Sequence, residues 1–163
     1  MSTGANMLSE QALERIDREI AKYPPEQRPS AVMAALNIAQ QEKGWLSPQT
    51  IAGVAAYLEM PEMAAWEVAT FYNMYDLKPV GRYKITVCTN LPCALSGGVH
   101  AADYLKGKLG IEFNETTADG KFTLKEGECM GACGDAPVLL VNNLRMRCFM
   151  TPQEIDKLLA ECE

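Results

Sequence analysis

Hydrophobic residues in the first half of the chain recur at the three-to-four-residue spacing of amphipathic helices. A capping serine or a proline precedes each of four such segments, at Ser9, Ser30, Ser47-Pro48 and Pro61. Gly44 is well placed to end the second of them. The first 75 residues are therefore predicted to form a small bundle of four short helices.

The pattern changes at the stretch 76–81, which contains proline and glycine and leads into a β-prone run. The predicted elements beyond it are a strand at 83–87, a helix at 94–109, strands near 121–124, 138–141 and 145–149, and a last helix capped by Thr151-Pro152. Asn142-Asn143 is predicted to be the hairpin turn between the last two strands. We therefore expect an α+β chain, with a helical bundle over residues 1–76 and a β-α-β-β-β-α domain over residues 77–163.

Composition and charge narrow the classes of function. With 163 residues, of which 48% are hydrophobic, the chain can bury a core. The net charge is −6 and there is no basic stripe, which argues against nucleic acid as a partner. No apolar run approaches the length of a membrane span, and residues 1–10 resemble neither a signal peptide nor a transit peptide. We therefore expect a cytoplasmic bacterial protein that does not insert into the membrane and whose partner is another protein.

Four of the six cysteines fall into two close pairs. Cys88 and Cys93 enclose four residues, Cys129 and Cys133 enclose three, and thirty-five residues separate the pairs. In a reducing cytoplasm, paired cysteines bind metal or perform redox chemistry more often than they form structural disulfides. The long spacer allows a strand and a helix to bring the pairs together around one metal centre. These four cysteines are therefore the predicted metal ligands.

The spacing alone leaves the kind of metal open. A structural zinc site tolerates such loops, although zinc ribbons usually pair cysteines two residues apart, and a dithiol redox pair is a third alternative. An iron-sulfur cluster is favoured because the second pair lies in a glycine-bearing loop, 127–134, whose N–H groups can donate to sulfur. The plant-type ferredoxin pattern does not fit, because its four-residue first loop is followed by a two-residue one.

The remaining candidate residues have weaker support. His100 is the only histidine, so a Rieske-type site is excluded and a surface position is expected. Cys148 and Cys162 have no close partner in the sequence, and we expect a packed thiol and an exposed one, respectively. The chain has no G-x-G-x-x-G motif after a strand and no phosphate-binding loop. A redox protein without a nucleotide site must exchange electrons with another subunit.

Four segments of the chain resemble one known family. They are Gln41–Ser47, Val68–Tyr72, Cys88–Cys93 and Glu128–Pro137, and they are similar to segments of the 24 kDa subunit of respiratory complex I, the E-type subunit of NADH:quinone oxidoreductases. The resemblance extends over nearly the whole chain. It implies a thioredoxin-like ferredoxin domain after the helical bundle, with one [2Fe-2S] cluster bound by Cys88, Cys93, Cys129 and Cys133.

The same resemblance implies a function and partners. It makes the chain an electron-transfer subunit of an enzyme complex, exchanging single electrons with a larger subunit that holds FMN and the NADH site. The isolated chain would then have no NADH site of its own. Other peripheral-arm subunits of complex I are further implied partners, and the complex would hold the chain on the inner face of the bacterial plasma membrane.

Three alternatives remain beside complex I. Similar modules occur in NAD-linked formate dehydrogenases and in NAD-reducing hydrogenases, so the resemblance defines the module better than the assembly. A zinc-stapled, thioredoxin-like interaction module without redox function is an alternative of a different class.

Overall fold

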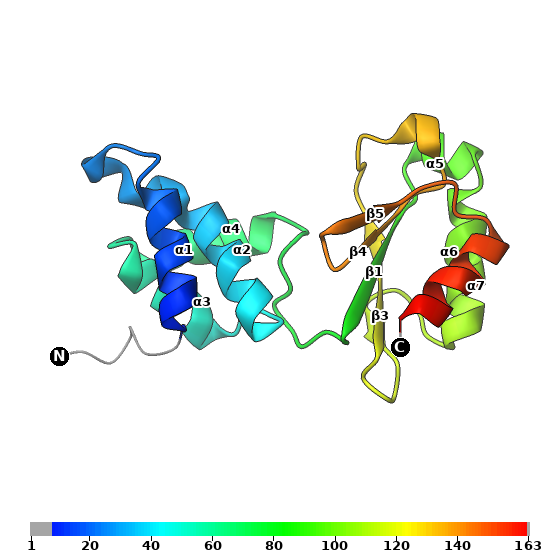
Figure 1. The fold of residues 1–163 in the computed structure, drawn as a ribbon, viewed down its shortest axis with the longest axis horizontal. Helices are drawn as coiled ribbons and strands as arrows, with labels where there is room; N and C mark the ends of the chain where they lie inside the picture. Colours follow the sequence, from blue (N-terminus) through cyan, green and yellow to red (C-terminus); the bar gives the residue numbers. More distant parts are fainter. Residues whose placement is uncertain (1–7, 163) are drawn as a thin grey trace. The chain divides into compact units, whose positions relative to one another are not determined.

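The structure, a computed structural model, describes residues 8–162 and divides into two compact units, one ending at Pro79 and one beginning at Val80 (Figure 1). We call them the helical unit and the sheet unit. Among the described residues, the first contains helices and no strand, and the second contains a five-stranded sheet with helices. The predicted α+β class, with helices preceding the sheet, is confirmed. Within residues 8–162, no helix has the length and apolar character that a bilayer crossing requires.

Two of the predicted serine caps begin helices of the helical unit. Its elements are α1 (Glu10–Ile20), the 3-10 helix η2 (Pro25–Ala31), α2 (Val32–Lys43), α3 (Pro48–Tyr57) and α4 (Glu62–Phe71). The Ser9 hydroxyl accepts a hydrogen bond from the Ala12 N–H, and Ser47 does the same for Thr50 at the start of α3. Each serine satisfies a backbone donor that the first helical turn leaves unpaired. Gly44 ends α2 in the left-handed conformation, with φ of 81°.

The predicted start of the second helix is wrong. Ser30 does not cap α2 but lies inside η2, and α2 begins at Val32. Pro25 and Pro29 hold φ near the helical value, so this segment winds as a 3-10 helix and runs on into α2 without an extended capping residue.

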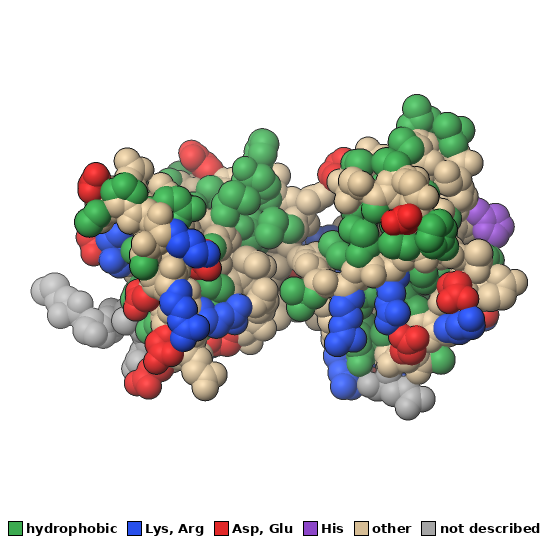
Figure 2. All heavy atoms as spheres, turned by 45° about the horizontal axis from the view of Figure 1, so that its top comes forward, with side chains coloured by type: hydrophobic (Ala, Val, Ile, Leu, Met, Phe, Trp, Pro, Cys, Tyr) green, Lys and Arg blue, Asp and Glu red, His purple; other side chains and the backbone are tan. Residues whose placement is uncertain are grey.

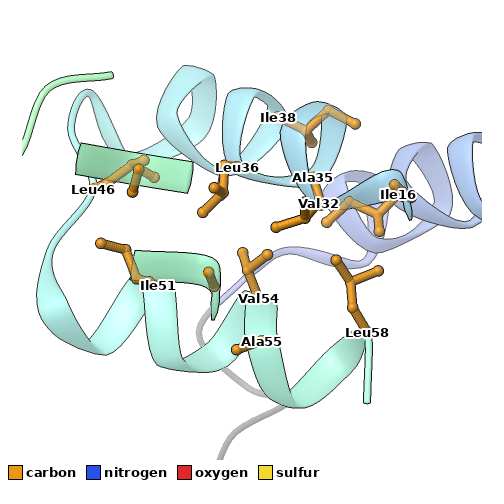
Figure 3. Packing of buried hydrophobic residues seen from close by; sticks show 14 of the residues in the cluster. Ile16, Val32, Ala35, Leu36, Ile38, Leu46, Ile51, Val54, Ala55 and Leu58 are labelled. Carbon is orange, nitrogen blue, oxygen red and sulfur yellow. The ribbon is translucent and has the colours of Figure 1, made fainter. Parts of the chain in front are cut away.

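A single apolar core holds the helical unit together. Its fully buried large side chains are Ile16, Leu36, Leu46, Ile51, Val54 and Leu58, which come from α1, α2, α3 and the segments flanking α3 (Figure 3). Gln40 is a buried polar residue beside this core. Its Nε2 donates to the Met74 carbonyl oxygen at 2.9 Å, and its Oε1 accepts from the Asp76 N–H at 2.6 Å. These two bonds hold the segment that follows α4 against α2.

The sheet unit has strand order β2-β3-β1-β4-β5. Its elements are β1 (Tyr83–Cys88), α5 (Leu91–Leu95), α6 (Gly98–Leu109), β2 (Glu115–Thr116), β3 (Phe122–Gly127), the 3-10 helix η3 (Cys133–Asp135), β4 (Leu139–Val141), β5 (Arg145–Arg147) and α7 (Pro152–Glu161). Strands β1 and β3 are parallel, and the other neighbouring pairs are antiparallel. Helices α6 and α7 pack against the sheet over the buried residues Ile85, Leu105, Leu124, Leu139 and Ile155 (Figure 1).

In this unit one predicted helix needs correction, one short strand was missed, and the predicted hairpin turn is confirmed. The single helix expected at 94–109 is wrong: α5 and α6 are separate because Gly97 adopts φ of 95°, a left-handed conformation that interrupts a right-handed helix. The two-residue strand β2 was not predicted, since it is too short to show alternation. Asn142 and Asn143 do form the turn between β4 and β5, with φ of 52° and 56°, the signs that a type I′ hairpin turn requires.

Candidate metal centre

The four predicted ligands lie where two parallel strands end. Cys88 is the last residue of β1 and is paired in register with Gly127, the last residue of β3. Cys93 follows in α5, and Cys129 and Cys133 follow Gly127 in the loop and in η3. Because the carboxyl ends of parallel strands meet at one edge of a sheet, both cysteine-bearing segments start from the same edge.

The thiols meet as two pairs. Cys93 lies in hydrogen-bonding contact with Cys88, and Cys133 with Cys129, while Cys133 also interacts electrostatically with both Cys88 and Cys93. Within residues 8–162, no three His, Cys, Asp or Glu side chains gather closely enough to enclose a single metal ion. A [2Fe-2S] centre places two thiolates on each of two irons. Two neighbouring thiol pairs are a donor set that fits such a centre.

The two pairs differ in their exposure to solvent. Cys88 and Cys93 are each 1% exposed, whereas Cys129 and Cys133 are exposed. The buried pair packs around Val138, whose carbonyl oxygen accepts from the Cys88 N–H at 3.2 Å. Met130, Ala132, Ala136 and Cys148 pack against the same cluster and are partly buried. One side of the site therefore excludes water, and the other opens to the surface.

Burial changes the acidity of these thiols. Desolvation, followed by the neighbouring Cys88 thiol, raises the pKa of Cys93 to about 11. Desolvation and the adjacent Cys129 also raise the pKa of the Cys133 thiol. Without metal, both thiols keep their protons at neutral pH. Because the thiolate is the ligand, metal binding has to displace those protons and is favoured by higher pH.

Gly98 contacts the backbone of both predicted ligands in the first pair. A Cβ atom at this position would lie 2.7 Å from the Cys88 carbonyl oxygen and 2.8 Å from that of Cys93. These contacts are closer than real Cβ atoms tolerate, and backbone atoms cannot move aside cheaply. Only glycine lets the first turn of α6 approach these two cysteines this closely. Sequence reasoning missed this role, although the Gly97-Gly98 pair just after Cys93 was a visible signal.

Exposed apolar side chains lie on segments next to the cysteines. Leu91 and Leu95 in α5 are 71% and 81% exposed, and Val99 at the start of α6 and Phe149 are exposed as well. The Phe149 N–H donates to the Asp135 carbonyl oxygen at 2.8 Å, which places this residue beside η3. We call these four residues the apolar rim. Figure 2 shows hydrophobic side chains gathered over the end of the sheet unit that carries α5.

The other candidates have different outcomes. His100 is exposed, as predicted. Cys148 is a packed thiol, as predicted, and it lies against the buried cysteine pair. The predicted exposure of Cys162 is wrong, because this residue is 5% exposed and belongs to the core of the sheet unit. It continues the apolar face of α7 that Ile155 and Leu158 begin, and helical spacing turns that face toward the sheet.

A family model and curated relatives match most of the chain. The model describes thioredoxin-like [2Fe-2S] ferredoxins and matches residues 16–163. The E-type subunit of the NADH-quinone oxidoreductase of Rickettsia felis is 48% identical over 143 residues, which cover 87% of this chain and 85% of that protein. NADH-quinone oxidoreductase subunit 2 of Thermus thermophilus is 39% identical over 145 residues, which cover 89% of this chain and 80% of that protein.

A solved structure shares the fold. The air-oxidized NAD+-reducing [NiFe]-hydrogenase superposes with a TM-score of 0.69 at 23% identity, over 86% of this chain. The match spans only 24% of the hydrogenase chain. At this identity the likeness describes the fold alone.

Proposed function

The chain belongs to the thioredoxin-like [2Fe-2S] ferredoxins, among the E-type subunits of NADH-quinone oxidoreductases, and from this membership we propose that it exchanges single electrons with the flavin-bearing subunit of such a complex. The family predicted from the four sequence segments is thus confirmed, as is the [2Fe-2S] cofactor that it implies. The observation that carries the function is the meeting of two thiol pairs at the shared end of β1 and β3.

We propose Cys88, Cys93, Cys129 and Cys133 as the cluster ligands. When bound, the [2Fe-2S] cluster supplies one-electron redox chemistry and no proton or hydride chemistry. The chain's own part is to hold the cluster with four thiolates and to keep water from the buried side, where Val138 packs with Cys88 and Cys93. The exposed pair leaves the other side open to a partner.

The apolar rim supports contact with the flavin-bearing subunit. Exposed apolar side chains that gather around a redox site are typical of a protein interface. The helical unit carries a second exposed apolar set, with Phe71 80% and Met63 69% exposed in α4 and Tyr72 directly after it. Phe71 and Tyr72 stack edge to face with ring centroids 5.0 Å apart. We assign both surfaces to partners within the complex, the larger FMN- and NADH-binding subunit first and other peripheral-arm subunits second.

Location and assembly follow from the same proposal. We place the chain on the cytoplasmic face of the plasma membrane, held there by the complex. The alternative assemblies are an NAD-linked formate dehydrogenase and an NAD-reducing hydrogenase, and the hydrogenase has the shared fold in its favour. The NADH-quinone oxidoreductase is preferred because relatives from such complexes, matched over most of their length, are 48% and 39% identical.

Metal analysis tests the function directly. The full chain, reconstituted anaerobically with iron and sulfide, is expected to hold about two irons and two labile sulfides and to give a one-electron EPR signal on reduction. Zinc bound in place of iron, with no visible absorbance, would instead support the zinc-stapled interaction module.

A further inference from the structure

A side-chain contact joins the two ligand-bearing segments at the point where strand pairing stops. The parallel ladder of β1 and β3 ends with Cys88 opposite Gly127. One residue beyond Cys88, the Thr89 hydroxyl donates to Glu126 Oε1 at 2.6 Å. Asn90 Nδ2 also approaches the Gly127 carbonyl oxygen, but at 3.5 Å. The Thr89 contact is therefore the shorter and stronger of the two cross-links.

On the β1 side, this contact lies beyond the backbone ladder: Thr89 follows the last paired residue, whereas Glu126 is still paired with Val87. After Cys88 the chain turns into α5, and after Gly127 it enters the loop that carries Cys129. Thr89 is the neighbour of the first ligand, and Glu126 is three residues before the third. A hydroxyl that donates to a carboxylate forms a charge-assisted bond, shorter and stronger than a neutral one. This side-chain bond therefore connects the segment that carries Cys88 and Cys93 to the segment that leads to Cys129 and Cys133.

We propose that Thr89 and Glu126 are positioning residues for the cluster, and that their hydrogen bond sets the spacing between the two pairs of ligands. This inference rests on the proposed function, because it needs the four cysteines as ligands. A cluster held by all four thiolates would require the two cysteine pairs at a fixed separation. The Thr89–Glu126 bond joins the residue that follows β1 to the end of β3 and fixes that separation in the folded chain.

Glu126 also has a second, separable effect. Its carboxylate is exposed and places a negative charge beside a centre that gains negative charge on reduction. The Thr89 hydroxyl and the charge of Lys106, which interacts with Glu126, offset part of this field. Removing the hydroxyl should therefore loosen the ligands, whereas removing only the charge should raise the midpoint potential.

Three variants of the full chain separate these effects. Thr89→Val keeps the side-chain shape and loses the donor, Thr89→Ser keeps the donor, and Glu126→Gln keeps an acceptor oxygen but loses the charge. Glu154→Gln is the charge control, because it removes the same charge from α7, which carries none of the four cysteines. Each variant is reconstituted with iron and sulfide. The rate of cluster loss to a chelator and the EPR-monitored midpoint potential are then measured.

We expect Thr89→Val to lose the cluster about fivefold faster than the unaltered chain, a modest factor because the bond is exposed. Thr89→Ser should restore the slow rate. Glu126→Gln should raise the midpoint potential with a smaller effect on the rate, and Glu154→Gln should change neither. Equal loss rates for Thr89→Val and the unaltered chain would overturn the inference. So would a metal-free Thr89→Val chain that unfolds at a much lower temperature than the metal-free unaltered chain, because a destabilised fold would by itself explain the faster cluster loss.

A failure of the proposed function can be distinguished from a failure of the positioning role. If the unaltered chain takes up no iron, the ligand assignment itself is wrong. If it holds a stable cluster that Thr89→Val holds equally well, only the positioning role is rejected.

Discussion

Cys88 and Cys93 are almost fully buried while Cys129 and Cys133 are exposed, so the four proposed ligands do not share one environment. The buried pair is held by β1, α5 and the Val138 backbone. The exposed pair lies in a loop where Gly131 adopts φ of 72°, a conformation that favours glycine. The first pair is therefore fixed by packing, and the second pair leaves the site open to solvent or to a partner.

Serine substitution tests each ligand. Replacing Cys88, Cys93, Cys129 or Cys133 by serine should weaken or abolish cluster binding, because a serine oxygen is a harder and more basic ligand than a thiolate. Iron content and visible absorbance after reconstitution measure the effect. Cys148→Ser is the matched control, since Cys148 packs against the same site without being a proposed ligand. A bleached Cys148→Ser protein together with a coloured Cys88→Ser protein would reverse the assignment.

Helix α6 is the element that most directly shapes the site. Its first residue, Gly98, lies against the carbonyl oxygens of Cys88 and Cys93, whereas Gly107, in the same helix, has no atom within 4 Å of an added Cβ. One glycine is required by a close approach, and the other is free to change. This contrast allows the role of the approach to be measured within a single helix.

Gly98→Ala should therefore displace the start of α6 or the first ligand loop and lower cluster retention, and it should cost about 1–3 kcal/mol of stability by overpacking. Gly107→Ala should be neutral or slightly stabilising, by up to about 1 kcal/mol, because alanine is the better helix former. Thermal unfolding of the metal-free chain and iron retention are the two measurements. Similar behaviour of the two variants would show that the close approach is unimportant.

In the helical unit, one carboxylate links α1 to α2. Glu42 accepts hydrogen bonds from the Ser9 hydroxyl at 2.7 Å and from the Ser9 N–H at 3.1 Å, and it pairs with Lys43 at 2.7 Å. These contacts, the Lys43 ammonium first, lower the pKa of Glu42 to about 2. The capping serine of α1 is thus itself held by a charged acceptor from α2.

The pH dependence of this link has a definite sign. A carboxyl group whose pKa is lower in the folded than in the unfolded state stabilises the fold above the unfolded value, 4.5, and loses that contribution as the pH falls toward 2. We expect the stability of the unaltered chain to fall over this window more steeply than that of Glu42→Gln, which has no such proton to bind. Urea unfolding across this acid range compares them. Parallel pH profiles would contradict this role for Glu42.

At the scale of the whole molecule, the chain combines a redox site with no nucleotide motif. The sequence contains neither the glycine-rich dinucleotide fingerprint nor a phosphate-binding loop. We therefore expect electrons from NADH to reach this chain through the proposed flavin-bearing subunit. The chain as a whole is proposed to consist of two domains, residues 1–76 and residues 77–163.

The isolated chain is thus expected neither to bind NADH appreciably nor to oxidise it. NADH oxidation should be observed only when the flavin-bearing subunit is added. Calorimetry with NADH and stopped-flow oxidation, with and without that subunit, measure this. Micromolar affinity of the chain alone for NADH would contradict the proposal that the NADH site lies on the partner subunit.

Binding to the flavin-bearing subunit tests the role of the apolar rim. Leu95→Ser should weaken binding to the flavin-bearing subunit, because it removes exposed apolar surface that a partner would bury, while leaving the cluster spectrum unchanged. Calorimetry with the purified flavin-bearing subunit measures the affinity. Unchanged affinity would remove Leu95 from the interface.

Much of this protein could be predicted from the sequence, because the relevant physics is local. Ser9, Ser47 and Thr151 cap helices by accepting hydrogen bonds from N–H groups three residues further along the chain, and Asn142-Asn143 forms its turn through its own backbone preferences. The two cysteine pairs also indicate a metal site by spacing alone. The family and the cofactor it implies came from a resemblance in four segments, two of which contain these cysteines.

Only the tertiary structure decided how distant segments meet. The parallel pairing of β1 with β3 brings both cysteine segments to one edge, and it allows Thr89 to bond with Glu126. The close approach of Gly98, the burial of Cys162 and the separate environments of the two thiol pairs likewise depend on packing. No local propensity specifies such contacts, because they form between residues far apart in the chain and depend on which faces are buried together.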